Sequence, residues 1–132
     1  MKNVLKQLLL LLVVICFLTG CGTMQGNMYI DAVKNGYPID YPNTNYEKAF
    51  GEFFSSPKWS YLQSDTNKHV VEFRGRCSLL DKEGNILIQF TVEDDGTTFE
   101  LSYIEFNGES LPMFLAMGLI ENAFNGDANE SQ

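Results

Sequence analysis

The 132-residue chain has little basic charge, because 9 Lys and Arg residues stand against 17 Asp and Glu residues and give a formal net charge of −8. Nucleic acids and anionic lipid headgroups are bound through clustered Lys and Arg side chains. The acidic balance therefore argues against both as partners. We expect no nucleic-acid ligand.

Histidine and cysteine are also scarce, with one His and three Cys in the chain. A zinc site needs three or four ligands of these types or carboxylates, and a catalytic His69 would need a nucleophile and an orienting acid within reach. The acidic turn Glu93–Gly96 is explained by turn chemistry more simply than by calcium, which takes six to eight oxygen ligands. We expect no catalytic residue and no metal, and we predict that His69 is an exposed residue at the end of a strand.

The first twenty residues have the order of a secretory signal. Two lysines, Lys2 and Lys6, precede an apolar run over residues 8–18, and the small residues Thr19 and Gly20 follow it. This order of a positive segment, an apolar segment and a small-residue cleavage site is typical of signal peptides. A membrane-spanning helix is the competing reading, but it needs roughly 20 predominantly apolar residues. We therefore predict a signal peptide over residues 1–20.

The stretch Leu18-Thr19-Gly20-Cys21 resembles a lipobox, the pattern at which the signal peptide of bacterial lipoproteins ends. The resemblance implies cleavage between Gly20 and Cys21, a diacylglycerol on the Cys21 thiol, and acylation of the new N-terminus. Two or more acyl chains anchor a protein stably, whereas one holds it only marginally. We expect a domain outside the cytoplasm that is tied to a membrane by lipid on Cys21 and carries no other cofactor.

The identity of that membrane depends on the type of cell. Gly22 follows the cysteine, in place of the Asp that often retains lipoproteins at the inner membrane. The resemblance therefore implies the outer membrane in a Gram-negative cell, and the outer leaflet of the single membrane in a Gram-positive cell.

Removal of the signal leaves 112 residues, of which 7 are basic and 17 acidic, so the formal charge becomes −10. This length predicts one domain. We divide it into a lipidated tether and lead-in over residues 21–42, an α+β domain over residues 43–125 and a polar tail over residues 126–132. Cys77 has no partner for a disulfide, because Cys16 leaves with the signal and Cys21 carries lipid, and we expect Cys77 to point into the core.

Aromatic spacing predicts a helix over residues 45–55. Thr44 and Glu47 have the spacing of a capping box, and Pro57 is expected to end the helix. Its apolar side chains recur at the i, i+3, i+4, i+7 and i+8 positions of one face: Tyr46, Ala49, Phe50, Phe53 and Phe54.

From Trp59 the apolar period changes from 3.6 to 2, which predicts antiparallel strands. The strands are expected over 59–63, 71–79, 86–92 and 99–106, with turns at 64–68, 81–85 and 94–96. Ile104 and Phe106 break the alternation of the last strand, which predicts a bulge near Tyr103 or a covered outer face.

A second helix is expected over residues 111–124, with Ser110 as its cap and Pro112 in its first turn. Residues 113–120 include no charged side chain. A helix that is apolar nearly all round is either buried or meets another surface. We predict an α+β fold in which an N-terminal and a C-terminal helix flank a meander of about four strands.

The body of the chain resembles a domain found in small bacterial lipoproteins of unknown activity. Five segments carry the resemblance, in the order Val33–Gly36, Ala49–Phe54, Pro57–Trp59, Val70–Gly75 and Gln89–Val92. The resemblance implies a fold and supplies no catalytic residues.

These observations predict a membrane-anchored, non-enzymatic binding or scaffolding module of the cell envelope with a protein partner. The partner is expected on a face that combines the outward arginines of one strand with apolar side chains: Arg74, Arg76, Ile104, Phe106, Leu115 and Leu119. An alternative is a carrier of a lipid or small hydrophobic ligand, with a cavity between Trp59, Tyr61 and Met117. A small hydrolase is a further alternative, which requires a polar cleft that gathers His69 with a carboxylate and a hydroxyl.

Overall fold

The structure is a computed structural model that describes residues 26–130. The signal segment 1–20 and the lipobox-like Leu18–Cys21 lie outside the described residues. Their prediction therefore rests on the sequence.

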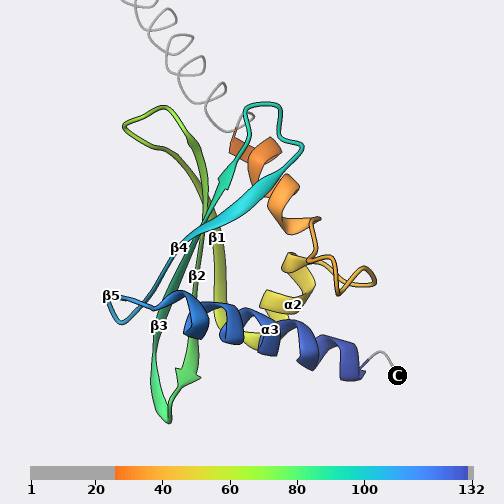
Figure 1. The fold of residues 1–132 in the computed structure, drawn as a ribbon, viewed down its shortest axis with the longest axis vertical. Helices are drawn as coiled ribbons and strands as arrows, with labels where there is room; N and C mark the ends of the chain where they lie inside the picture. The colour runs from red at the N-terminus through yellow and green to blue at the C-terminus, as the bar shows by residue number, and fades with distance from the viewer. Residues whose placement is uncertain (1–25, 131–132) are drawn as a thin grey trace, which may run out of the picture.

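One antiparallel sheet organises the fold, with five strands in the order β1-β2-β3-β4-β5 (Figure 1). The strands are β1 (Ser55–Gln63), β2 (His69–Leu79), β3 (Lys82–Val92), β4 (Phe99–Phe106) and β5 (Glu109–Ser110). A helical segment over 26–34, the helix α2 (Tyr46–Phe53) and the helix α3 (Met113–Glu130) complete the described part. The predicted α+β meander is confirmed, and the short β5 is added to it by a two-residue turn at Asn107-Gly108, where both residues have positive φ.

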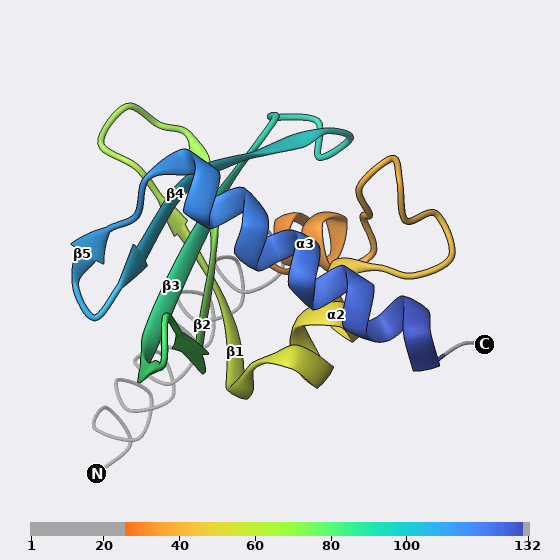
Figure 2. The same ribbon diagram turned by 60° about the horizontal axis from the view of Figure 1, so that its bottom comes forward.

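The helices share one core with the inward face of the sheet (Figure 2). Alternation along β2 and β3 places every second side chain in this core, as the period of two requires. The buried cluster draws on every helix and on the three central strands: Tyr29, Val33, Ala49, Phe50, Phe54, Val71, Phe73, Ile86, Ile88, Phe90, Val92, Ile104, Ala116, Leu119, Ile120, Ala123 and Phe124.

The start and end of α2 differ from the predicted helix. Asn45 is the N-cap instead of Thr44, because its side chain accepts a hydrogen bond of 2.9 Å from the backbone N–H of Lys48. The helix ends at Phe53, and Pro57 lies within β1 instead of ending the helix. Because β1 is an edge strand and its register shifts between Ser55 and Lys58, proline is tolerated there.

The turn between β2 and β3 is shorter than predicted. Leu80 and Asp81 form it alone, with φ of 51° and 64°, while Lys82 pairs with Leu79. Primed two-residue turns of this kind match the twist of the flanking strands. The prediction of a turn over 81–85 is wrong because Gly84 was read as a turn residue. Gly84 lies inside β3, where a side chain would collide with the Asn107 side chain.

The predicted bulge is confirmed one residue from Tyr103. Gln89 pairs with Tyr103 and Phe90 pairs with Leu101, so Ser102 is the extra residue of β4. The Ser102 hydroxyl donates a hydrogen bond of 3.1 Å to the Gln89 carbonyl. The bulge turns Ile104 back to the core face, where it is 4% exposed.

The folded region extends further at both ends than residues 43–125. The helical segment 26–34 buries Tyr29 and Val33 in the core, so it belongs to the domain and not to a tether. At the other end α3 begins at Met113 instead of Leu111 and continues through Glu130, past the predicted tail boundary. Ser110 lies in β5 and does not cap the helix.

Candidate functional site

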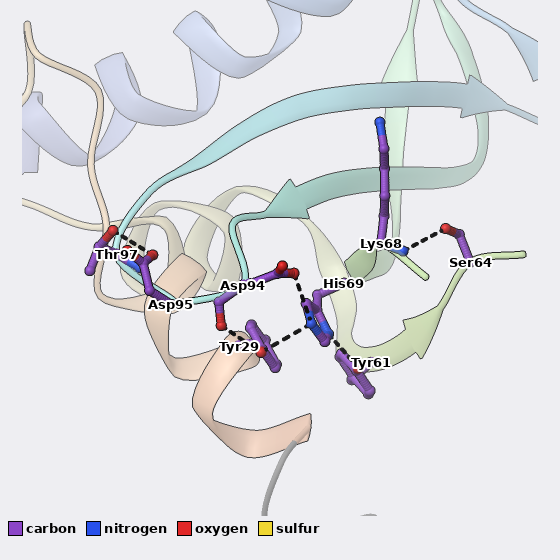
Figure 3. A network of polar contacts seen from close by, with 8 residues as sticks. All are labelled: Tyr29, Tyr61, Ser64, Lys68, His69, Asp94, Asp95 and Thr97. Carbon is purple, nitrogen blue, oxygen red and sulfur yellow. Dashed lines mark hydrogen bonds and ion pairs between the residues drawn. The ribbon is translucent and has the colours of Figure 1, made fainter. Parts of the chain in front are cut away.

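His69 is the centre of a buried polar cluster and is not the exposed residue that we predicted. It is 8% exposed at the first position of β2. Its Nε2 atom lies 3.1 Å from the Tyr29 hydroxyl and 3.3 Å from an Asp94 carboxylate oxygen, and its Nδ1 atom lies 2.7 Å from the Tyr61 hydroxyl (Figure 3). The Tyr29 ring stacks on the imidazole with centroids 4.0 Å apart.

Both ring nitrogens of His69 and both tyrosine hydroxyls have polar partners. The Tyr29 hydroxyl donates to the Asp94 carbonyl at 2.9 Å, which leaves its oxygen free to accept from His69. In the neutral imidazole with a proton on Nε2, Nδ1 accepts from the Tyr61 hydroxyl and the Nε2–H points between Tyr29 and Asp94. This assignment satisfies the buried groups and joins the helical segment 26–34, β1, β2 and the β3–β4 turn.

The Tyr61 hydroxyl, the His69 imidazole and the Asp94 carboxylate lie in a row. The alternative function of a small hydrolase requires a hydroxyl, a histidine and a carboxylate in this order. Its electrostatics oppose nucleophilic use of the hydroxyl, because burial and the neighbouring Tyr29 raise the pKa of the Tyr61 phenol. A phenol with a raised pKa is a weaker source of phenolate. The arrangement is suited to holding four segments of the chain together.

Replacing His69 by alanine is expected to lower the free energy of unfolding by about 2–4 kcal/mol. The substitution removes the ring stack, takes the His69 partner from the part-buried Tyr61 hydroxyl and leaves the Tyr29 hydroxyl with the Asp94 carbonyl alone. Lys68→Ala changes the exposed neighbour and is expected to stay within about 0.5 kcal/mol of the parent. Urea unfolding measures both. Hydrogen exchange should show the largest loss of protection in residues 26–34. Equal stability of the two variants would contradict the role of His69.

The second candidate site is an exposed apolar stripe on α3, which we name the α3 stripe. It consists of Met113, Phe114 and Met117, which are 59%, 73% and 54% exposed. The neighbouring side of the helix is buried in the core through Ala116, Leu119, Ile120 and Ala123. The core therefore buries one part of the apolar surface that the sequence predicted for this helix. The α3 stripe is the part that remains exposed to solvent.

A cleft of about 270 Å³ borders the α3 stripe and shares Met117 with it. The cleft lies between α3, the loop before α2, and β4. Its lining is mainly apolar and aromatic, with one carboxylate from the loop and one from α3: Pro38, Asp40, Tyr41, Tyr46, Leu101, Met117, Ile120, Glu121 and Phe124. The Tyr41 hydroxyl donates to the Asn125 side chain at 2.7 Å and ties the loop to α3.

The residues predicted to form a partner face do not lie together. Ile104 and Leu119 are buried in the core, Phe106 packs against it, and Leu115 is half-buried. Ile104 pairs with Ile88 on the helix-covered face, because the bulge at Ser102 reverses the parity of β4. The prediction of one exposed face is therefore wrong for these apolar residues.

The two arginines of the predicted face lie on the opposite side of the sheet. Arg74 contacts the Glu72 carboxylate at 3.3 Å, and Arg76 donates to Asn85 at 2.8 Å. Glu72 also accepts from Gln89 at 3.1 Å. Cross-strand pairing therefore uses Asn85 and Gln89, and the arginines stand apart from the α3 stripe.

Cys77 points toward the core, as predicted. It is half-buried against the core cluster, and burial raises the pKa of its thiol. A raised pKa keeps the sulfur in the less reactive thiol form.

In the part of the chain that the structure describes, the predicted cavity residues Trp59, Tyr61 and Met117 have separate surroundings and do not together line one of the clefts found there. Trp59 packs on Phe50 and Phe73 in the core, and Tyr61 belongs to the His69 cluster. Met117 lines the α3 cleft instead. Sequence reasoning missed Asp94 and Tyr29 as partners of His69, and it missed Asp40 and Glu121 beside that cleft, because each set comes together from distant parts of the chain.

No family model, curated protein or solved structure matches this chain. Within residues 26–130, no helix is both long enough and apolar enough to cross a membrane. The described part of the chain also has no group of three or more His, Cys, Asp or Glu side chains that are placed to hold one metal ion.

Proposed function

We propose that this chain is a lipid-anchored protein of the cell envelope that acts as a non-enzymatic binding module for another envelope protein. The anchor part of the proposal rests on the signal pattern and on Cys21. The binding part rests on one observation, the exposed α3 stripe. Contiguous exposed apolar side chains on a small domain are typical of interaction sites.

The α3 stripe has a composition that suits a protein partner. Aromatic side chains and methionine are enriched at protein interfaces, and methionine adapts its shape to the surface that it meets. Phe114 is the largest member and the most exposed, so it is the expected anchor residue of the contact. A partner that buries the α3 stripe removes apolar surface from water, which is favourable by about 25 cal/mol per Å².

The location of the α3 stripe favours a partner in the envelope space and not the bilayer that anchors the chain. Figure 1 places the start of the helical segment 26–34 near one end of the long axis and α3 in the opposite half. Only four residues separate Cys21 from residue 26, so that connection spans at most about 18 Å. A lipid on Cys21 would hold the first end of the domain close to the membrane and direct α3 away from it.

Photocrosslinking in intact cells tests the binding part of the proposal. With a benzophenone amino acid in place of Phe114 in the full-length chain, we expect a covalent adduct of one defined mass. The matched control carries the same amino acid in place of Leu80, which is 78% exposed on the β2–β3 turn. The adduct should be absent at Leu80 and should disappear at position 114 when Met117→Asp is added. Equal adducts at both positions, or none at position 114, would contradict the proposal.

A carrier of small hydrophobic ligands is the second candidate, and the α3 cleft is the observation that favours it. Its volume of about 270 Å³ lies just below the range of roughly 300–1,000 Å³ that is typical of pockets for small molecules. The cleft therefore has room for a small ligand or a side chain, and less room than a lipid chain needs. Mass spectrometry of the purified protein distinguishes the two candidates, since a carrier would retain a ligand of defined mass.

A further inference from the structure

The α3 cleft combines aromatic walls with two carboxylates. Phe124 contacts both tyrosines, because it stacks on Tyr41 with centroids 5.4 Å apart and meets Tyr46 edge-on at 4.9 Å. Asp40 approaches from the loop and Glu121 from α3. The lining includes no Lys, Arg or His.

Both carboxylates are unpaired within the described part of the chain. Neither Asp40 nor Glu121 takes part in an ion pair or a side-chain hydrogen bond with residues 26–130. Both side chains carry negative charge where they line the cleft, and the chain as a whole has a formal charge of −8. The electrostatic potential at the cleft therefore favours a cationic ligand over an anionic one.

The apolar part of the lining defines the rest of the ligand. Leu101, Met117 and Ile120 offer surface for a short hydrocarbon stem. Tyr41 and Tyr46 are half-buried, so their rings are available to attract a cation that lies over a ring face. Arginine and lysine side chains have this form, with a hydrocarbon stem and a charged head. Anionic groups and bulky neutral groups match the cleft less well.

We propose that the α3 cleft is the specificity pocket of the interface and receives the side chain of an arginine or lysine from the partner protein. This inference rests on the proposed function, because Met117 belongs both to the cleft and to the α3 stripe. A basic residue next to an apolar segment of the partner would occupy the cleft while that segment covers Phe114. Asp40 and Glu121 would then favour those apolar partner segments that also carry a basic residue.

A pair of small probes tests the cleft without knowledge of the partner. Butylguanidinium has the stem and head of an arginine side chain, and butylurea is its uncharged near-isostere. The full-length protein in a neutral detergent, labelled with ¹³C at the methionine methyl groups, reports binding through Met117. Met28 in the helical segment 26–34 serves as the internal control, because its side chain lies beside Gly96 of the β3–β4 turn and does not line the cleft.

Titration of butylguanidinium is expected to shift the Met117 signal in a saturable way and to leave Met28 unmoved. Binding should be about fivefold tighter than that of butylurea, as two partly exposed charge contacts predict. In the double variant Asp40→Asn, Glu121→Gln, the two probes should bind within about twofold of each other. Both substituted side chains are exposed, so the fold is expected to persist, and an unchanged Met28 signal checks this.

Equal affinity of the two probes for the parent protein, or a Met117 signal that does not move, would overturn the cationic pocket. The crosslink from position 114 is measured separately. If position 114 gives a defined adduct but the cleft shows no preference for butylguanidinium, the proposed binding function stands and only the inference about the cleft is wrong.

Discussion

Replacing Phe50 by alanine is expected to lower the free energy of unfolding by about 3–5 kcal/mol, the usual cost of deleting a buried phenylalanine. Phe50 is fully buried at the centre of the aromatic core. Its ring contacts Phe54, Trp59, Phe73, Phe90, Phe124 and Tyr46, with centroids 4.9 to 6.3 Å apart. Alanine would leave a cavity between α2, α3 and the sheet that these large rings cannot fill without leaving their rotamers.

The matched control is Phe53→Ala on the same helix. Phe53 is 37% exposed and has one ring contact, to Phe54 at 4.9 Å, so its loss is expected to cost about 1 kcal/mol. Urea unfolding followed by the fluorescence of Trp59 measures both variants, since Trp59 packs on Phe50. Equal costs for the two substitutions would contradict the position of Phe50 in the core.

Replacing Cys21 by serine is expected to abolish the incorporation of labelled palmitate into the protein. Serine has no thiol to form the thioether with diacylglycerol, so the chain loses its acyl groups. Each acyl CH₂ that leaves the bilayer costs about 0.8 kcal/mol. The anchor is therefore the largest single contribution to membrane binding that the proposal includes.

Cys77→Ser is the control for this experiment, because it changes the cysteine that the structure describes and leaves Cys21 in place. Its labelling should equal that of the parent protein. Mass spectrometry of the N-terminal peptide should find the parent chain beginning at Cys21 with acyl groups attached. Continued labelling of the Cys21→Ser protein would overturn the proposed anchor.

Local patterns predicted most of the secondary structure. Alternation in β2 and β3 and the aromatic spacing of α2 are properties of neighbouring residues, so they can be read along the chain. The helical segment 26–34 was missed as part of the domain because only Tyr29 and Val33 bury large side chains there. The length of α3 was underestimated because Gly126 and the polar residues after it predict fraying.

The candidate sites depended on contacts between distant residues. Tyr29 is 40 residues from His69 and 65 residues from Asp94 in the chain. No spacing rule connects such positions, so the solitary histidine looked exposed. Asp40 and Glu121 likewise come from a loop and from the last helix, and only the packing of Tyr41 and Phe124 brings them to one cleft.

The sequence by itself determined the class of fold, the excess of acidic charge and the expectation of a lipid on Cys21, because periodicity, composition and a four-residue motif are local properties. The tertiary structure alone decided which apolar residues remain exposed. A bulge at Ser102 turns Ile104 into the core, and packing of α3 on the sheet buries Leu119 while it leaves Phe114 in water. Burial depends on how elements pack against each other, and a helix with apolar residues on every side does not specify which side the sheet will cover.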